Sequence, residues 1–538
     1  MTSPLLRSLR VAFIAALSSS LGACVGMVED SAPRSRTMPG QERLEPLPAG
    51  LRALTARQYA ASVRTVLDLP DSVVVPEVGL WASSIAASES SARGSVEDYA
   101  RVAEQLTEQV FADPALRDRL TDGCVATLAD GDPCVLSVIA RVGRRAFRRR
   151  LGVDELGRWS GAAQAAGTEL SDAERGLAFA IAGMLQSPSF LYRVEVPEPA
   201  GEGEPSMYGS DALATRLAFF LWDATPDDAL LDAAESGDLL DPDRYDAIVD
   251  RMLADERAER GVEAFVEELL QSQMLSCDGD SCSDVLERER FLPSFEAQLV
   301  HTAVGAVNEG GFRGLLTSRT AWLNAETAPF YGVDAQDLGP DLEPVALPAG
   351  SVRAGVLLTP GLLAALSSSG SPSVARRGLY VLRQFLCDTI PPPPSDVDTR
   401  LPEGIEGPVT TRDLVRMHEI PACAGCHAKI DPIGLGLERF GADGAYRSEQ
   451  QGLSIDPSGT LSGRHFDDAV ELSELIADDD AFMPCVTSHL VERAVGAAGG
   501  SRSAPVADVA DEAQGDVRVT MRAVTRMDAF RFAWGAMP

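Results

Sequence analysis

Five consecutive residues, Cys423-Ala424-Gly425-Cys426-His427, are the part of this sequence with the most specific chemistry. Two thiols three positions apart lie on one side of a helical turn, and the histidine that follows can turn its imidazole toward a bound iron. Thiols at this spacing can form thioethers to the vinyl groups of a porphyrin. The motif therefore predicts one covalently attached haem c, held by Cys423 and Cys426 and ligated on its proximal side by His427.

The same motif has three other interpretations: a redox-active dithiol, half of a zinc site, and a plain disulfide. Zinc requires two further ligands, and no second CxxC or CxxH appears nearby. A thioredoxin-like dithiol requires a βαβ setting, which the residues Ile430-Asp431-Pro432-Ile433-Gly434 do not supply. Haem is therefore the leading interpretation, a dithiol or disulfide comes next, and zinc comes last.

The predicted distal ligand of the iron is Met483. Met483-Pro484 is expected on a loop ahead of a helix, and a thioether sulfur suits a low-spin haem that transfers electrons. The alternative is that Met483 is a core residue, the commoner fate of methionine. An open sixth position would instead permit peroxide or oxygen chemistry.

His489 is the rival to Met483 as the distal ligand. It is predicted to lie on an apolar helical face, where a buried, hydrogen-bonded histidine is an equally good interpretation. His418 and His465 are weaker candidates, and His301, far upstream on a predicted helix, is expected to be structural.

The N-terminus carries the pattern of a secretory signal. Arg7 and Arg10 precede an apolar run, which ends in Leu21-Gly22-Ala23-Cys24. This arrangement resembles a lipobox, in which Cys24 is acylated and becomes the mature N-terminus; an ordinary cleavage site is the alternative. The apolar run is too short for a stable transmembrane helix. We therefore expect an exported protein in the periplasm or at the cell surface. A lipid anchor should attach it to a membrane of the cell envelope, in particular the outer membrane.

The chain has nine cysteines, and an oxidising compartment should leave few of them unused. With Cys24 assigned to lipid and two assigned to the motif, six remain, which is an even number. Short loops could be closed by Cys124 with Cys134 and by Cys277 with Cys282, which would leave Cys387 and Cys485 to join distant segments. Six cysteines allow about fifteen connectivities, so these pairings are expectations and not deductions.

The net charge of −33 argues against a nucleic-acid partner, because phosphate backbones are bound through clustered Lys and Arg. A solvated acidic surface explains the charge. The sequence has no G-x-S-x-G elbow, no HExxH and no glycine-rich phosphate loop after a strand, so no hydrolase constellation competes with the haem motif.

Helical periodicity dominates the rest of the chain and predicts a mainly α fold of several helical bundle domains, with a cytochrome-c-like haem region at the C-terminal end. Ser95 is expected to cap one helix and Asp241, before Pro242, another, and an apolar stripe predicts a helix over Val262–Leu270. The best strand candidates lie between Val345 and Leu358. A loose stretch from Gly496 to Gly515 is expected to be a long surface loop.

Composition breaks divide the sequence into six segments. These are 1–23, a lipoprotein signal peptide; 24–50, a flexible tether; 51–196, N-terminal helical domains; 207–310, a central helical domain; 311–408, a helical domain that ends in a proline-rich linker; and 409–538, the domain that contains the CxxCH motif.

Several segments, in this order, resemble a family of secreted cytochrome-like proteins abundant in planctomycetes and myxobacteria, defined by a string of domains of unknown function. The matching segments are Leu54 to Tyr59, Val63 to Leu67, Arg145 to Arg149, Gln186 to Arg193, Arg216 to Trp222, Pro226-Asp227, Arg251 to Asp255, Arg353 to Leu357, Ser371-Pro372, Arg377-Gly378, Pro391 to Pro394, Pro421 to Leu437, Arg447, Asp456 and Asp528 to Arg531. The chain departs from many relatives in having no separate N-terminal cytochrome module and in reading Phe440-Gly441-Ala442-Asp443-Gly444 where a Phe-Asp pair is usual.

The resemblance implies an architecture more than an activity. Together with the motif, it leads us to expect an envelope-anchored c-type haem protein that works in electron transfer or another redox process with a partner protein. The alternatives are a haem-dependent oxidoreductase acting on an exported substrate, and a binding or scaffold lipoprotein without haem.

Overall fold

The computed structural model describes eight stretches of the 538-residue chain: 52–76, 93–198, 205–272, 292–368, 371–391, 407–416, 421–496 and 504–534. These stretches are mainly helical, as the sequence predicts, and their strands pair only into two-stranded sheets. No helix within them is long and apolar enough to cross a membrane.

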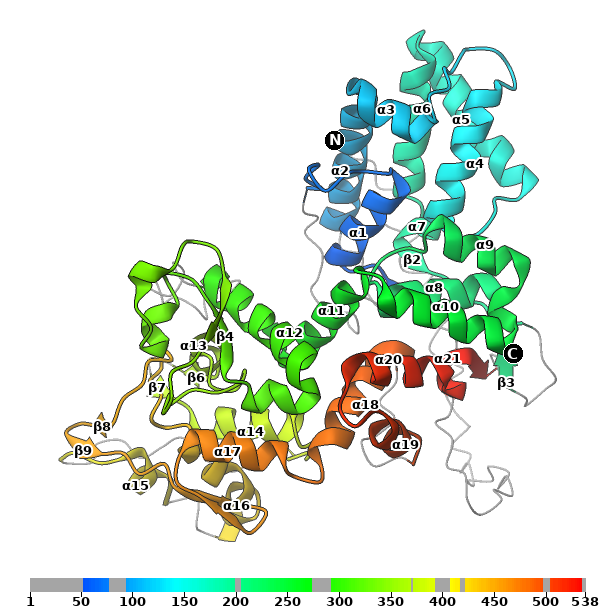
Figure 1. The fold of residues 1–538 in the computed structure, drawn as a ribbon. Helices are drawn as coiled ribbons and strands as arrows, with labels where there is room; N and C mark the ends of the chain where they lie inside the picture. Colours follow the sequence, from blue (N-terminus) through cyan, green and yellow to red (C-terminus); the bar gives the residue numbers. More distant parts are fainter. Residues whose placement is uncertain are drawn as a thin grey trace, which may run out of the picture. The chain divides into compact units, whose positions relative to one another are not determined.

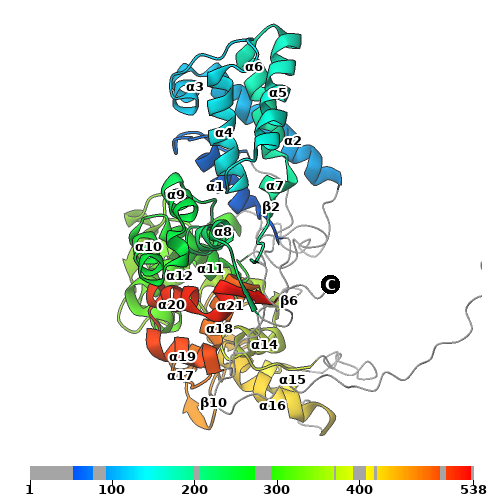
Figure 2. The same ribbon diagram turned by 90° about the vertical axis from the view of Figure 1, so that its right-hand side faces the viewer.

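The N-terminal part of the fold is a helical bundle in which α4, α5 and α6 run side by side (Figures 1 and 2). Strands β1 (Arg52–Ala53) and β2 (Tyr192–Arg193) pair antiparallel at the two ends of this segment. The helices are α1 (Ala56–Val66), α2 (Arg93–Ala112), α3 (Pro114–Thr121), α4 (Pro133–Phe147), α5 (Val153–Leu170), α6 (Ala173–Leu185) and α7 (Pro188–Leu191). Their apolar faces enclose one core, which includes Tyr59, Ile139 and Phe190.

The central part begins with β3 (Pro205–Met207) and continues through helices that the sequence starts with clear capping signals. Asp241 accepts hydrogen bonds from the backbone N–H groups of Asp243 and Arg244, with Pro242 in the first turn, as predicted. The elements are α8 (Ser210–Leu221), α9 (Asp228–Ser236), the 3-10 helix η3 (Asp238–Leu240), α10 (Pro242–Ala254), α11 (Ala258–Leu270) and α12 (Leu292–Thr317). The predicted helix over Val262–Leu270 lies within α11, and α12 is kinked at Gly311, which has a φ of 60°.

The third part of the fold follows α12 and ends in the helix that will support the CxxCH motif. Its elements are β4 (Thr320–Leu323), η6 (Ala328–Tyr331), η7 (Ala335–Asp337), β5 (Glu343–Ala346), α13 (Pro360–Ala365), β6 (Ser367–Ser368), β7 (Ser371–Pro372) and α14 (Val374–Gln384). Strands β4 and β5 pair antiparallel, as do β6 and β7.

The C-terminal part contains the motif on its second helix, and its end returns to the central part. Its elements are α15 (Thr411–Val415), α16 (Pro421–Gly436), β8 (Glu449–Gln450), β9 (Leu453–Ser454), β10 (Gly459–Leu461), β11 (Arg464–Phe466), α17 (Ala469–Ala477), α18 (Phe482–Val495), α19 (Ala504–Ala513), α20 (Val517–Arg526), α21 (Asp528–Arg531) and β12 (Phe532–Trp534). Strand β12 pairs antiparallel with β3, so residues more than 300 positions apart form one ladder. Most of the described buried apolar residues from Tyr208 to Ala533 belong to one large hydrophobic core, beside two small clusters around Leu323 and Leu435.

Four local expectations are wrong, and each has a physical reason. Helix α2 begins two residues before Ser95, because neither Arg93 nor Gly94 interrupts a helical backbone. Only the start of the predicted strand region is extended, as β5, because the apolar residues from Ala354 to Leu358 enter the core as turns. The expected loop 496–515 contains α19, whose apolar face packs into the core. Met483 lies inside α18 and not on a loop.

Candidate functional site: the cysteine-histidine motif of α16

The two cysteines of the motif are unpaired thiols in the N-terminal half of α16. Both are half-buried, and Cys426 packs against the large core. In the described part of the chain the other four cysteines are joined as two disulfides, so Cys423 and Cys426 differ from them. Three positions apart on a helix, the two side chains emerge about one turn from each other on the same side.

His427 is oriented by a carboxylate one turn along the same helix. Its Nδ1 lies 2.8 Å from Oδ1 of Asp431, at the i, i+4 spacing that brings side chains together on a helix. An ionised carboxylate only accepts, so the Nδ1–H of the imidazole donates to Asp431. In that tautomer the lone pair is on Nε2, and a carboxylate partner of this kind is the usual support of a metal-binding imidazole.

A cavity of about 620 Å³ opens beside His427. One face of α16 forms a wall of this cavity, α15 forms another, and β10 completes it. The lining residues are Arg412, Val415, Arg416, Ala424, His427, Ala428, Asp431, Pro432, Leu435, Gly459 and Thr460. The walls are thus largely apolar, with one imidazole, one carboxylate, one hydroxyl and two guanidinium groups, and such a combination is typical of small-molecule sites.

Helix α16 is held in place by a close crossing with α14. A Cβ atom at Gly434 would overlap the carbonyl oxygen of Val374, and one at Gly378 would overlap that of Ile430. Glycine at both positions lets the two backbones approach in a way that no other residue permits. Arg377-Gly378, one of the segments that resemble the family, therefore lies at this close crossing.

Arg377 of α14 fixes the end of α16. Its buried guanidinium donates to the carbonyl oxygens of Leu437 and Phe440 at 2.8 Å each and to that of Gly441 at 2.9 Å. Burial, opposed by Glu438, lowers the pKa of this arginine to about 10. The side chain is still charged at neutral pH, and its positive charge near the C-terminus of α16 interacts favourably with the helix dipole.

Buried Glu438 ties α15 to the residues that follow α16. The hydroxyl of Thr411 donates to its Oε1 at 2.8 Å, and Arg447 pairs with the same oxygen at 2.5 Å. Burial raises the pKa of Glu438, while Thr411 and Arg447 act in the opposite direction. This link positions Arg412, the neighbour of Thr411, at the cavity.

The structure separates the predicted distal ligands from one another. Met483, on α18, packs its terminal methyl group against Gly515 and does not line the cavity. His465, on β11, is the cross-strand partner of Thr460, which does line it, and the Nε2 of His465 lies 2.9 Å from Asp467. Met483 as the distal ligand stays a prediction, and it requires this side chain to leave Gly515.

The remaining histidine candidates lie elsewhere. His489 is on α18, beside the disulfide between Cys387 and Cys485. The ring of His301 lies 5.2 Å from that of Trp322 between centroids, in keeping with a structural role. His418 is outside the described residues.

Two of the expected disulfides are present. Cys124 and Cys134 close a short loop ahead of α4, and Cys387 and Cys485 join the end of α14 to α18. Cys277 and Cys282, and the proposed lipidation residue Cys24, are outside the described residues.

Sequence reasoning missed three contributors to this site: Asp431, Arg377 and Arg412. Asp431 could have been found, because a carboxylate four residues after the motif histidine must face it on a helix. The two arginines act from α14 and α15, and no local spacing connects them with α16.

Three consecutive segments match known protein families. Residues 134–195 match PSD5, residues 209–333 match PSD4 and residues 353–450 match PSCyt3, described as proteins of unknown function DUF1595, DUF1592 and DUF1588. The third match contains α14, α16 and the whole motif. The chain is thus a multi-domain protein assembled from domains of unknown function. Comparisons with curated proteins and with solved structures gave no match.

Proposed function

We propose that this chain is a c-type haem protein of the cell envelope that works in electron transfer or another redox process. One observation carries the proposal. Two unpaired thiols, one helical turn apart, precede a histidine whose ring is oriented by Asp431. His427 lines a cavity of about 620 Å³, whereas Cys423 and Cys426 lie on α16 outside the residues that line it.

The donor set fits a covalently attached haem. Cys423 and Cys426 would form the thioethers, and His427 would bind the iron through Nε2. Apolar lining from Val415, Pro432 and Leu435 suits the face of a porphyrin. The haem, when bound, supplies the one-electron chemistry.

The other side chains at the cavity have separate roles in this proposal. Asp431 holds the proton on Nδ1 of His427, and this raises the basicity of the coordinating nitrogen. Arg416 would pair with a propionate carboxylate, since guanidinium groups bind carboxylates in a planar, two-pronged geometry. Arg412 already donates to the carbonyl oxygens of Asp456 and Ser458, so it would contribute positive charge at the cavity.

The test of haem attachment is a pyridine haemochrome spectrum of the full chain made in a strain with c-type maturation machinery. We expect the α-band of thioether-linked haem in the wild type and its loss in the Cys423→Ser/Cys426→Ser variant. The Cys124→Ser/Cys134→Ser variant, which also loses two cysteines, is the matched control and should keep the band. Absence of covalent haem from the wild type would leave the scaffold lipoprotein as the better interpretation.

The sixth ligand decides between electron transfer and an oxidoreductase that acts on an exported substrate. If Met483 is the ligand, Met483→Ala should make the ferrous iron bind carbon monoxide readily and should lower the reduction potential, because a thioether favours the ferrous state. His465→Ala, on the hairpin beside the cavity, is the comparison. If the wild type already binds carbon monoxide quickly and neither variant changes that rate, the oxidoreductase would be favoured.

The proposed envelope location rests on the signal-like N-terminus and Cys24. We expect Cys24→Ser to give an unacylated protein and the lipoprotein signal peptidase inhibitor globomycin to block maturation. Detergent partitioning and lipid labelling measure both effects. Unchanged labelling in the variant would contradict lipidation and leave export untouched.

A further inference from the structure

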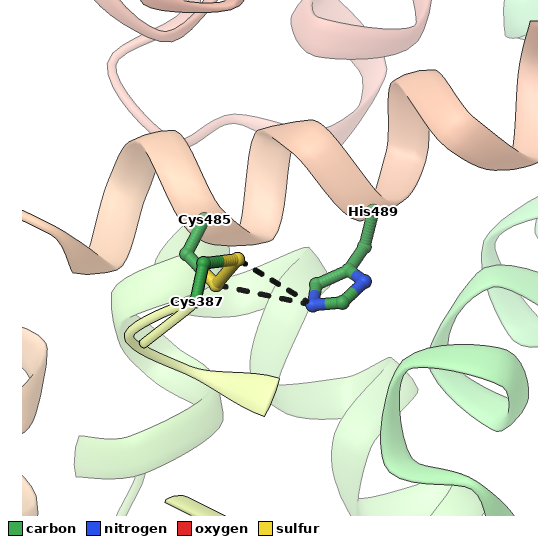
Figure 3. Close-up of side chains that lie close together, drawn as sticks. All are labelled: Cys387, Cys485 and His489. Carbon is green, nitrogen blue, oxygen red and sulfur yellow. Dashed lines mark hydrogen bonds between the residues drawn. A yellow bond between two sulfur atoms is a disulfide. The ribbon is translucent and has the colours of Figure 1, made fainter. Parts of the chain in front are cut away.

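A second group of metal-ligating side chains lies away from the cavity, at the disulfide between Cys387 and Cys485 (Figure 3). Cys387 follows α14, whereas Cys485 and His489 are one turn apart on α18. The i, i+4 spacing places these two side chains on the same face of the helix. In Figure 3 the imidazole of His489 points its Nε2 at both sulfur atoms.

The distances are close to those of a tetrahedral metal site. The Nε2 of His489 lies 3.9 Å from the Sγ of Cys387 and 3.8 Å from that of Cys485, and the three ligand atoms lie within 4.8 Å of one another. Zinc with tetrahedral angles holds a nitrogen and a thiolate sulfur about 3.6 Å apart and two sulfurs about 3.8 Å apart. The histidine is therefore already placed, and only the two sulfurs must separate.

We propose that Cys387, Cys485 and His489 form a redox-gated site for a thiophilic divalent metal ion such as zinc, and that the disulfide is the closed form of this site. A dithiol reductant would open the site by thiol–disulfide exchange. The two thiols of the reductant become a disulfide, and Cys387 and Cys485 become thiols. Binding of the metal then releases two protons and forms two metal–thiolate bonds and one metal–imidazole bond.

The surroundings of the three residues suit such a site. Cys485 is fully buried, and Cys387 and His489 are half-buried.

The backbone allows the sulfurs to move apart. Cys485 is inside α18 and is fixed by that helix, whereas Cys387 lies after the end of α14, in a half-buried segment outside any helix or strand.

The other described disulfide provides an internal comparison. Cys124 and Cys134 are also joined across a short distance, with 5.7 Å between their Cα atoms. In the part of the chain that the structure describes, the trio of Cys387, Cys485 and His489 is the single group of three or more such ligands. Metal binding that appears only after reduction should therefore depend on the cysteines of the disulfide beside His489 and not on Cys124 and Cys134.

The test is a titration of the full chain with Co²⁺, before and after reduction by a phosphine. The Cys423→Ser/Cys426→Ser background removes the competing thiols of α16. We expect thiolate-to-cobalt absorption with one equivalent of metal after reduction, and none before it. His489→Ala should weaken binding by more than about tenfold, because one of three ligands is lost. Cys124→Ser/Cys134→Ser should leave the titration unchanged.

Two results would overturn the proposal: no cobalt–thiolate absorption in the reduced protein, or equal affinity in His489→Ala and its parent. If Cys485→Ser fails to fold because its side chain is fully buried, Cys387→Ser removes the other sulfur ligand from a half-buried position and must abolish binding. The titration does not depend on haem, so its failure would leave the haemochrome test untouched.

Discussion

The pair formed by His427 and Asp431 is the smallest unit with chemical consequences in this protein. Their 2.8 Å contact links Nδ1 of the imidazole to a carboxylate and leaves Nε2 as the nitrogen that would bind the iron in the proposed function. Such a partner gives the imidazole partial anionic character, and an anionic ligand stabilises ferric over ferrous iron. The electronic effect is separate from attachment, which depends on the two cysteines.

Asp431→Asn should therefore raise the reduction potential of the haem-loaded protein. A tenfold change in the ferric-to-ferrous preference corresponds to about 59 mV for one electron, and we expect a shift of this order. Potentiometric titration measures it. Asp467→Asn removes the carboxylate of a second histidine–aspartate pair, at 2.9 Å from His465, and is the matched control. Equal potentials in the wild type and Asp431→Asn would show that the carboxylate does not tune the iron.

The crossing of α14 and α16 decides where the motif lies. Two glycines permit the backbones to touch, and Arg377 binds carbonyl groups of the residues that follow the helix. Pro432 lies inside α16 and lacks the N–H that would bond to the preceding turn, so packing must compensate for that lost hydrogen bond.

Gly434→Ala should destabilise the fold, because its methyl group would collide with the carbonyl oxygen of Val374. Overpacking of this kind costs about 1–3 kcal/mol. Urea denaturation of the protein without haem measures the loss. Gly425→Ala is the control on the same helix: its Cβ would meet nothing within 4 Å, and alanine favours the helix by about 0.5–1 kcal/mol. We expect Gly434→Ala to lower the free energy of unfolding and Gly425→Ala to raise it. Equal changes in the two variants would contradict the close crossing.

At the scale of the whole molecule, a buried charge network joins parts of the chain that are far apart in sequence. Glu195, just after β2, pairs with Arg193 at 2.7 Å and with Arg216 of α8. The Nε of Arg216 also donates to the carbonyl oxygen of Phe530 in α21 at 2.8 Å. One carboxylate thus links the end of the N-terminal bundle, the central helices and the C-terminal end of the described fold.

Glu195→Gln should destabilise the protein by about 3–5 kcal/mol at neutral pH, because buried guanidinium groups lose their counter-charge. Burial alone would raise the pKa of Glu195, but Arg216, Arg193 and Arg52 outweigh it and lower the pKa to about 2. A carboxyl with a lowered folded pKa stabilises the fold above its ordinary value of 4.5 and loses that contribution as the pH falls toward 2.

The wild type should therefore lose stability between about pH 4.5 and pH 2, and the variant should lose less in that interval. Denaturation curves across this range test the prediction. Glu155→Gln breaks a more exposed pair with Arg149, which should be worth at most about 1 kcal/mol. Indistinguishable losses in the two variants would show that the Glu195 network contributes no more than a surface ion pair.

The features that the sequence by itself determined depend on interactions between residues that are close together in the chain. Capping by Asp241, the apolar stripe of α11 and the spacing of Cys423, Cys426 and His427 act over one or two turns, so they are visible in the order of residues. The same locality explains the errors: the glycine- and serine-rich residues around α19 predict a loop, although the apolar face of α19 itself has helical spacing.

Tertiary structure alone decided which distant groups meet. Arg377 reaches the end of α16, Arg412 reaches the cavity, and His489 meets both sulfurs of a disulfide between residues 98 positions apart. The sequence predicts Met483 as the distal ligand with His489 as its rival, because each is a donor at a suitable distance along the chain. Their different positions follow from which helix faces the core buries, and that is a property of the packed molecule and not of any segment of it.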